Sequence, residues 1–484
     1  MVKKRKRIYS NSRQRTLKNA AGILLAVSLA SGCVNTYQPT NRAIDRIDEQ
    51  SGYRAFSEAR LRGTGENVVV LSFSGGGTRA AVLSYGVMQE LRDTSIVSNG
   101  NRVRLLDEID TISAVSGGSF TAAYYGVFGE RLFETYEQDF LSQSIQSILL
   151  KRLLRPAHWF KAIFSGFDRT EMAIELYDHM VFKGATFADI PLDQRPYIEI
   201  NATDLATGQR FPFTQERFDL LCSDLGEFSI ARAVTASSAV PVAFPTVVLK
   251  NHADRCDISN TREWRLLNEE ETRGPIQQEF VDDLKSYRDV AKRRFIHLVD
   301  GGISDNLGLR AVIDRIDTIG EEIFEQISLN PPRNILIILV NAETNPDRVI
   351  GNTAKKPSLG VTIGAFSNAQ ITRYNLETRD NLRRKVEEFR VLARQHDWPT
   401  RIYFSEVSFE NVPNKEASRF LNNLPTSLEL DDVEINALIT TARILLRHEP
   451  EFERFLGDNG GQLAEGAMSE EEGCKYFNHK RCEQ

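Results

Sequence analysis

Residues 67–79 read Asn-Val-Val-Val-Leu-Ser-Phe-Ser-Gly-Gly-Gly-Thr-Arg, and they indicate the fold class of this chain of 484 residues. Asn67–Phe73 is largely apolar and β-branched, which predicts a strand buried on both faces. Ser74–Gly77 predicts a turn, and apolar positions recur at helical spacing over Arg79–Leu91. A buried strand that passes directly into a helix is typical of a parallel sheet covered by helices.

The same order of elements recurs further along the chain. Leu106–Val115 predicts a strand, and a helix is expected from Ser119 onward. More buried strands are predicted at Tyr197–Ala202, Arg294–Val299 and Asn334–Asn341. Beyond Asp397 the sequence predicts one strand, Arg401–Phe409, and one helix, Asp432–Arg447. We therefore expect an α/β three-layer sandwich with a mostly parallel central sheet over residues 66–345. Residues 346–484 are expected to form a smaller mixed extension that completes or flanks this domain.

The amino terminus has the layout of a secretion signal. Eight of the 60 basic residues lie in residues 1–32, which contain no acidic residue, and the apolar run Ala20–Ala30 follows them. At about 11 residues this run is too short to span a bilayer, which takes about 20. The sequence Leu29-Ala-Ser-Gly-Cys33 resembles a lipobox, although Ala30 stands where leucine is commoner. The pattern predicts a signal over 1–32, acylation of Cys33 and a polar linker over 33–65, while an ordinary signal peptide remains the alternative. Val34 after the cysteine resembles the sorting pattern of outer-membrane lipoproteins, so we expect a bacterial envelope location.

Composition excludes some classes of function. Hydrophobic residues make up 41% of the chain and charged residues 26%, as expected for a packed globular protein. Because the amino terminus holds so many cations, the rest is more acidic than the net charge of −6 suggests, which argues against nucleic-acid binding. Histidines are few and there is no Cys-x-x-Cys, so neither a metal site nor a cofactor is expected. In an exported protein the remaining cysteines favour two disulfides, with the neighbouring pairs Cys222–Cys256 and Cys474–Cys482 preferred and free thiols as the alternative.

Ser113-Ala-Val-Ser116-Gly-Gly118 lies at a predicted junction of strand and helix. A nucleophile elbow places its serine on such a turn, where the flanking residues must be small. Ala114 replaces the first glycine of the usual Gly-x-Ser-x-Gly pattern. Ser116 is nevertheless the only serine between the end of the strand and the two glycines, so it is the candidate nucleophile; a plain glycine-rich turn is the alternative.

Gly75–Gly77 follow a buried strand and precede a helix, so their backbone N–H groups can converge on an anion. No Gly-Lys-Ser/Thr follows, and position 80 is alanine, so neither nucleotide-binding loop fits. We expect an oxyanion hole, with Gly76 and Gly77 as the first donors and Gly75 and Gly117 beside them; a tight structural turn is the alternative. Arg79 is expected either to bind a lipid phosphate or to brace the loop.

Val299-Asp-Gly-Gly302 ends another predicted strand, and the two glycines free the backbone to bring Asp300 toward the site. Asp300 is the candidate general base, ahead of Asp305 five residues later. Alone, the motif also fits an ordinary Asp-Gly turn. His297 is three residues back on a strand, so it should point to the opposite face.

Gly-Gly-Gly-x-Arg, a serine elbow and Asp-Gly-Gly occur here in the order typical of patatin-like phospholipases, a family that works with a Ser–Asp dyad. Ala236-Ser-Ser-Ala-Val-Pro241 with Phe244-Pro245 resembles a further block of that family. The resemblance covers roughly residues 67–345. It implies that Ser116 attacks an ester carbonyl while Asp300 takes its proton and later activates water.

We therefore expect a phospholipase A or lysophospholipase-like acyl-ester hydrolase whose partner is membrane phospholipid or another lipid ester. The alternatives are a hydrolase of soluble esters or thioesters and a catalytically idle envelope scaffold. Phe140–Phe167 mixes aromatic and basic residues, which fits either an interfacial helix or ordinary covering helices.

Overall fold

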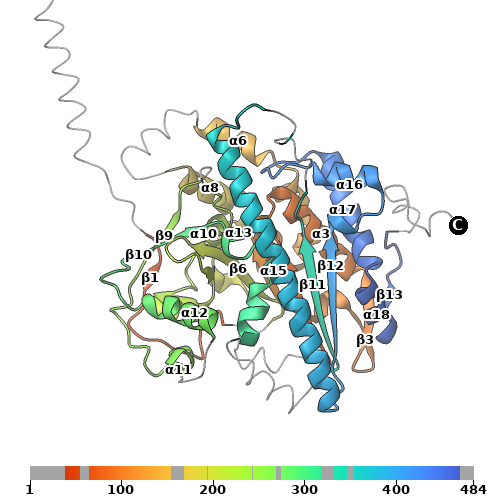
Figure 1. Cartoon of the computed structure of the whole chain (residues 1–484), viewed down its shortest axis with the longest axis horizontal. Coiled ribbons are helices and arrows are strands. Elements are labelled where there is room, and N and C mark those ends of the chain that lie inside the picture. Colours follow the sequence, from red (N-terminus) through yellow and green to blue (C-terminus); the bar gives the residue numbers. More distant parts are fainter. Residues whose placement is uncertain are drawn as a thin grey trace, which may run out of the picture.

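The computed structural model describes residues 39–54, 65–153, 168–192, 194–241, 244–268, 274–317, 332–345, 351 and 354–468. Within them, a central sheet of eight strands runs in the order β12-β11-β2-β5-β6-β10-β9, and β7 pairs with β6. Figure 1 labels β12, β11, β6, β10 and β9 of this sheet. Its strands are β2 (Asn67–Phe73), β5 (Ile109–Val115), β6 (Tyr197–Asp204), β7 (Arg210–Pro212), β9 (Val247–Lys250), β10 (Phe295–Val299), β11 (Asn334–Asn341) and β12 (Arg401–Ser408).

The pairing from β12 through β11, β2 and β5 to β6 is parallel, whereas β10, β9 and β7 are antiparallel to their neighbours. The mixed α/β fold with a mostly parallel sheet that the sequence predicts is thus confirmed. Short strands outside this sheet are β1 (Arg42–Ala43), β3 (Thr94–Ser98), β4 (Asn101–Arg104), β8 (Ser223–Asp224) and β13 (Gln462–Leu463).

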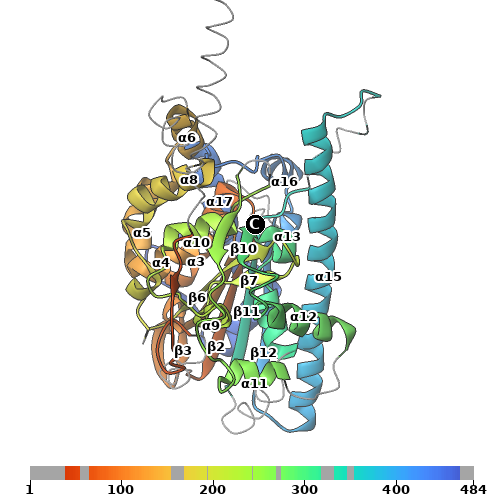
Figure 2. The same ribbon diagram turned by 90° about the vertical axis from the view of Figure 1, so that its left-hand side faces the viewer.

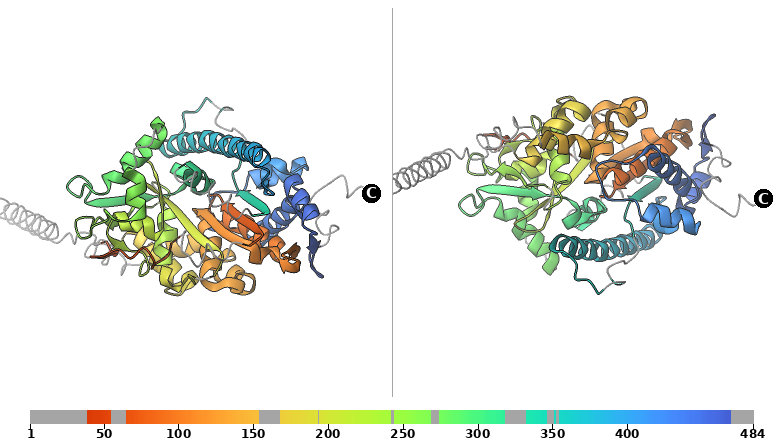
Figure 3. Two further views of the ribbon diagram at one scale, coloured as in Figure 1. Left: turned by 90° about the horizontal axis from the view of Figure 1, so that it is seen from below. Right: turned by 90° about the horizontal axis from the view of Figure 1, so that it is seen from above.

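Helices cover both faces of the sheet, as the end-on views show (Figure 3). α3, α4, α10, α17 and α18 contact the strands on one side, and α13 and α15 contact them on the other. The helices are α3 (Thr78–Arg92), α4 (Gly117–Phe128), α5 (Leu132–Tyr136), α6 (Ile145–Leu153), α8 (Arg169–Tyr177), α9 (Gln215–Leu220), α10 (Ile230–Ser237), α11 (Arg262–Asn268), α12 (Pro275–Ser286), α13 (Gly302–Asp305), α15 (Leu359–Gln395), α16 (Lys415–Asn422), α17 (Asp432–Arg447) and α18 (Pro450–Asp458).

Strand β11 shows why these apolar runs become central strands. Ile337 and Leu339 pack with Leu382 of α15 on one face, while Leu336 and Ile338 belong to the larger core cluster on the other. Successive side chains of a strand point to opposite faces, so a strand between two helical layers needs apolar residues throughout.

Several predicted boundaries need correction. The strand predicted at Leu106–Val115 begins at Ile109, because Leu105–Glu108 form a 3-10 turn. The 37-residue helix α15 was not predicted.

Phe140, in the segment that the sequence offered as membrane-facing, is buried and stacks on Phe120 at 4.4 Å between ring centroids. The part of that segment over 154–167 lies outside the described residues.

The described part of the predicted linker, residues 39–54, belongs to the folded body. β1 pairs with β8, and Tyr53 is buried against Tyr197. The Tyr53 hydroxyl accepts from the backbone N–H of Ile198 at 2.7 Å and donates to its carbonyl at 3.1 Å. No helix among the described residues is long and apolar enough to cross a bilayer. The signal segment and Cys33 lie outside the described residues.

Candidate active site

Ser116 stands alone between the end of β5 and the start of α4, on a strained backbone. Its φ is 49° and its ψ is −122°, a conformation that residues with a Cβ rarely adopt. The Ser116 N–H donates to the Ser237 hydroxyl at 2.8 Å, and that hydroxyl donates to the Asn201 carbonyl at 2.6 Å. The turn is therefore held in place by α10 and β6, which together offset the cost of the strain.

Asp300 follows β10 and meets Ser116 across the site. Its backbone N–H donates to the Ala239 carbonyl at 3.0 Å, and its own carbonyl accepts from the Thr203 hydroxyl at 2.8 Å. On the side chain, Oδ1 accepts from the Gly302 N–H at 2.8 Å. Oδ2 accepts from the Ser116 hydroxyl at 2.9 Å. The structure thus brings together the two residues that the sequence singled out, 184 positions apart.

Burial makes the carboxyl of Asp300 more basic than usual. Ser116 is 6% exposed and Asp300 is 8% exposed. Loss of hydration raises the pKa of Asp300 to about 6, and the hydrogen bonds from Gly302 and Ser116 only partly oppose this shift. A carboxyl with this pKa is mostly ionised at neutral pH and accepts a proton more readily than an exposed aspartate.

The glycine loop adjoins the elbow directly. A Cβ on Gly117 would lie 1.9 Å from the carbonyl oxygen of Gly77, and a Cβ on Gly75 would lie 3.3 Å from Cβ of Ser116. Gly76 and Gly77 have φ of 144° and 63°, values that favour glycine. Only residues without a side chain allow the two backbones to approach so closely.

The N–H groups of this loop divide into two kinds. Gly75 donates to the Asn306 carbonyl at 2.8 Å, so its N–H is already used and the expectation that it belongs to the oxyanion hole needs correction. Within the described part of the chain, the N–H groups of Gly76, Gly77 and Gly117 have no protein acceptor. These three donors, next to Ser116, can receive an oxyanion.

The family model of patatin-like phospholipases matches residues 71–313, half of the chain. The chain belongs to the patatin-like phospholipase family. Members of this family are lipid acyl hydrolases. No curated protein sequence matches the chain. Among solved structures, VipD from Legionella pneumophila is similar at 12% identity and a TM-score of 0.31, over 90% of this chain and 73% of that one.

Arg79, next to the glycine loop of this patatin-like chain, is buried at 3% exposure. Its Nε donates to the Ala342 carbonyl at 3.0 Å, its Nη1 to the Leu424 carbonyl at 2.6 Å, and its Nη2 to the Thr426 hydroxyl at 3.3 Å. Desolvation lowers its pKa to about 10. Of the two roles left open by the sequence, these contacts support bracing of the loop, because protein acceptors occupy the guanidinium.

The two rivals of Asp300 have partners other than the serine. The carboxylate of Asp305 accepts from the Arg310 N–H at 2.8 Å. Burial raises the pKa of Asp305 to about 6, and the charges that act on it are those of Arg210, Asp314 and Arg310. His297 is exposed, and its Nδ1 lies 3.2 Å from the Thr246 hydroxyl. Neither contact involves Ser116.

Sequence reasoning missed the residues that hold Ser116 and Asp300 in place. Ser237, Asn201 and Thr203 fix the backbones of Ser116 and Asp300, yet none carries a motif of its own. Ser237 lies within the block Ala236–Pro241 that resembles the family, and this was the available signal. Asn201 and Thr203 occupy a strand recognised only by its apolar neighbours.

Cys222 and Cys256 form a disulfide, the pairing that sequence proximity favoured. Cys474 and Cys482 lie outside the described residues. In the described ranges, no group of three or more His, Cys, Asp or Glu side chains could hold a metal ion.

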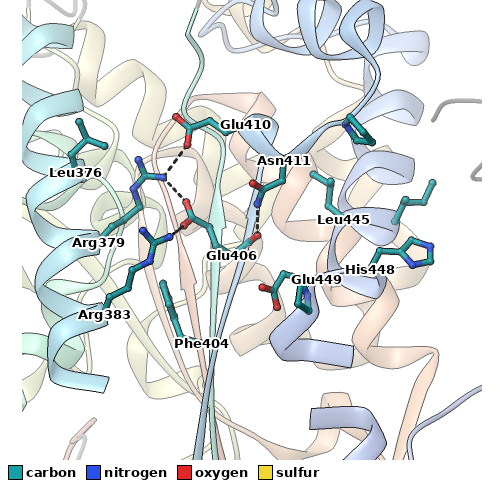
Figure 4. A pocket seen from close by; sticks show the side chains of 13 residues that line it. Leu376, Arg379, Arg383, Phe404, Glu406, Glu410, Asn411, Leu445, His448 and Glu449 are labelled. Carbon is teal, nitrogen blue, oxygen red and sulfur yellow. Dashed lines mark hydrogen bonds and ion pairs between the residues drawn. The ribbon is translucent and has the colours of Figure 1, made fainter. Parts of the chain in front are cut away.

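A cavity of about 890 Å³ lies elsewhere, between α15, β12 and the end of α17 (Figure 4). Its cations are paired with its own carboxylates. Arg379 contacts Glu406 at 2.7 Å and Glu410 at 3.2 Å, and Arg383 contacts Glu406 at 3.1 Å. The lining does not include Ser116 or Asp300, so this cavity is separate from the candidate site.

Proposed function

We propose that the protein is a serine acyl-ester hydrolase acting on phospholipid or lysophospholipid, with Ser116 as nucleophile and Asp300 as general base. One observation carries the proposal: the Ser116 hydroxyl donates at 2.9 Å to a buried carboxylate whose pKa is raised to about 6. A serine hydroxyl is too weak an acid to attack without an adjacent base, and a partly desolvated carboxylate is such a base.

In the first half-reaction the Ser116 oxygen bonds to the ester carbonyl carbon as its proton moves to Asp300. The tetrahedral oxyanion accepts hydrogen bonds from Gly76, Gly77 and Gly117. On its collapse the bond to the lipid alcohol breaks, and Asp300 returns the proton to that alcohol. Water then attacks the acyl-serine while Asp300 takes its proton, and collapse of the second intermediate releases the fatty acid and returns the proton to Ser116. A well-placed donor in such a hole contributes about 3 kcal/mol or more to the transition state.

The proposed location is a bacterial envelope, with the chain anchored through acylated Cys33. The amino-terminal pattern supports it, and the Cys222–Cys256 disulfide adds support because disulfides persist in oxidising compartments. Metabolic labelling with an alkyne fatty acid tests the anchor. Wild type should take up the label and Cys33→Ser should not; equal labelling of both would contradict it.

The test of the activity compares wild type with Ser116→Ala and Asp300→Asn. Lipid mass spectrometry after incubation with mixed phospholipids should show free fatty acid and lysolipid with wild type alone. A fluorophosphonate probe should label wild type and leave Ser116→Ala unlabelled, with heat-denatured wild type as the control for nonspecific reaction. We expect each substitution to lower turnover by at least about a thousandfold. Undiminished labelling of Ser116→Ala would remove this serine from the mechanism.

A further inference from the structure

The first turns of α15 project beyond the body of the protein. Figure 2 shows this end of the helix standing clear of the sheet and its other helices, at the same end of the molecule as α6. Val361 is 49% exposed and Phe366 is 66% exposed. Ala365 and Ala369, on the same turns, are also exposed.

These projecting turns carry polar side chains such as Ser367 and Asn368 but no charge, and their apolar side chains are open to solvent. Residues 357–372 contain no charged side chain at all. A helix surrounded by water normally carries charged and polar residues on its open face, whereas an apolar helix is covered. Large exposed apolar surfaces on soluble proteins are typically binding sites for a protein or a membrane.

The chain topology places this helix end at the catalytic edge. The chain leaves β11 at Asn341, and α15 is the return connection to the start of β12, so α15 begins near the carboxyl ends of the parallel strands. The glycine loop lies at that edge too, since Arg79 holds the Ala342 carbonyl directly after β11.

Other exposed apolar residues lie beside the dyad. Val240 is 45% exposed and follows Ala239, whose carbonyl accepts from the Asp300 N–H. Ile303 is 43% exposed and lies three residues after Asp300. The catalytic edge therefore presents apolar groups both at the dyad and on the projecting helix.

Cations flank the uncharged stretch. Lys355 and Lys356 precede it and Arg373 follows it, and all three side chains are exposed. An uncharged helical segment with exposed apolar side chains, bordered by basic residues, matches an anionic lipid surface, whose head groups attract the cations while its acyl region takes the apolar side chains.

We propose that the first turns of α15 insert into the interface of an anionic phospholipid membrane and hold the catalytic edge against it. Insertion requires the exposed apolar side chains and the flanking cations, and it does not require Ser116 or Asp300. Insertion is also independent of any anchor at Cys33. Because insertion needs neither Ser116 nor Asp300, its failure can be distinguished from failure of the proposed hydrolysis.

The first experiment uses the full chain carrying Cys33→Ser and Ser116→Ala, with tryptophan placed at position 366 or 391. Val391 lies near the other end of α15, is 39% exposed and gives a matched control. Vesicles of phosphatidylglycerol and brominated phosphatidylcholine in roughly equal parts should quench the added fluorescence of Phe366→Trp and not that of Val391→Trp. Equal quenching at both positions, or at neither, overturns the proposal.

The second experiment measures vesicle affinity in the same background. Because two apolar side chains lose their burial, Val361→Ser with Phe366→Ser should weaken binding by about tenfold or more, while Val391→Ser leaves it unchanged. Replacing phosphatidylglycerol by phosphatidylcholine should also weaken binding, roughly fivefold for each cation near the surface. If the double variant binds vesicles as tightly as its parent and instead turns a dimer into a monomer in sedimentation, a second copy covers the helix and the membrane proposal is wrong.

Discussion

Burial at Asp300 sets the pH range in which this residue can act as a base. Desolvation raises its pKa to about 6, so the carboxylate is protonated below that pH and cannot accept the serine proton. We expect kcat/KM for a chromogenic ester to fall about tenfold for each pH unit below about pH 6 and to reach a plateau above that pH. The residual turnover of Asp300→Asn should show no such fall below pH 6. A fall that begins near pH 4 would mean that an ordinary, exposed carboxylate is the base.

The same shift predicts how Asp300 affects stability. Its folded pKa of about 6 lies above the ordinary value of 3.8, so its contribution is fully present below pH 3.8 and is lost as the pH rises through 6. A difference of about two between folded and unfolded pKa corresponds to roughly 2–3 kcal/mol. Asp300→Asn should therefore be more stable than wild type by up to about this amount at pH 7.5 and no more stable at pH 4. Urea unfolding at the two pH values measures this; a less stable Asn variant at pH 7.5 would mean that the ionised carboxylate stabilises the fold.

At the scale of elements, the contact between elbow and glycine loop is the tightest requirement of the site. An alanine Cβ at position 117 would lie 1.9 Å from the Gly77 carbonyl oxygen, so one backbone must move. We expect Gly117→Ala to lower turnover by about a hundredfold or more, because a displaced loop misplaces the oxyanion donors. Gly457→Ala, in α18, is the matched control: a Cβ there meets nothing within 4 Å, so activity should be unchanged. Full activity in Gly117→Ala would show that the loop does not contribute donors.

Elements were predictable from sequence where both faces are buried. β2 and β11 match their predicted bounds because a nearly continuous apolar run is favourable only where both of its faces are buried. The start of β5 was not predictable, because Leu105 and Leu106 are equally apolar in a 3-10 turn and in a strand. α15 did carry a signal in its second half, where Leu382, Val386, Phe389 and Ala393 recur at helical spacing in the core. The turns before Arg373 are uncharged, and side chains such as Val361 and Phe366 are exposed there, so no core-facing periodicity is present in that part.

The candidate site was predictable only in part. Ser116, Asp300 and the glycines stand out because strain and close approach restrict which residues fit. The partners of their backbones do not stand out, because a serine or threonine hydroxyl can donate and accept almost anywhere. The use of the Gly75 N–H by Asn306 likewise depends on how two distant loops meet, which sequence spacing does not encode.

At the scale of the whole molecule, the C-terminal part extends the same central sheet that positions Ser116 and Asp300. β12 adds to the central sheet in parallel with β11, and α17 packs on α3. The two helices are joined by a buried ion network, in which Glu90 of α3 accepts from Arg443 at 3.1 Å and from Arg447 at 2.7 Å. Glu90 is fully buried and compensates both cations, of which Arg443 also pairs with Asp93 at 2.7 Å.

Removal of Glu90 should therefore destabilise both parts together. Glu90→Ala leaves two buried guanidinium groups with less compensation, and we expect it to lower the free energy of unfolding by about 3–5 kcal/mol. Asp380→Ala breaks the exposed pair with Arg384, in which both side chains are 66% exposed, and should cost no more than about 1 kcal/mol. In urea, circular dichroism and esterase turnover should be lost in one coincident transition for wild type and both variants, earliest for Glu90→Ala. If the C-terminal part only flanked the catalytic residues, Glu90→Ala would lose part of its helical signal at a denaturant concentration where turnover is intact, because the dyad would not depend on α17.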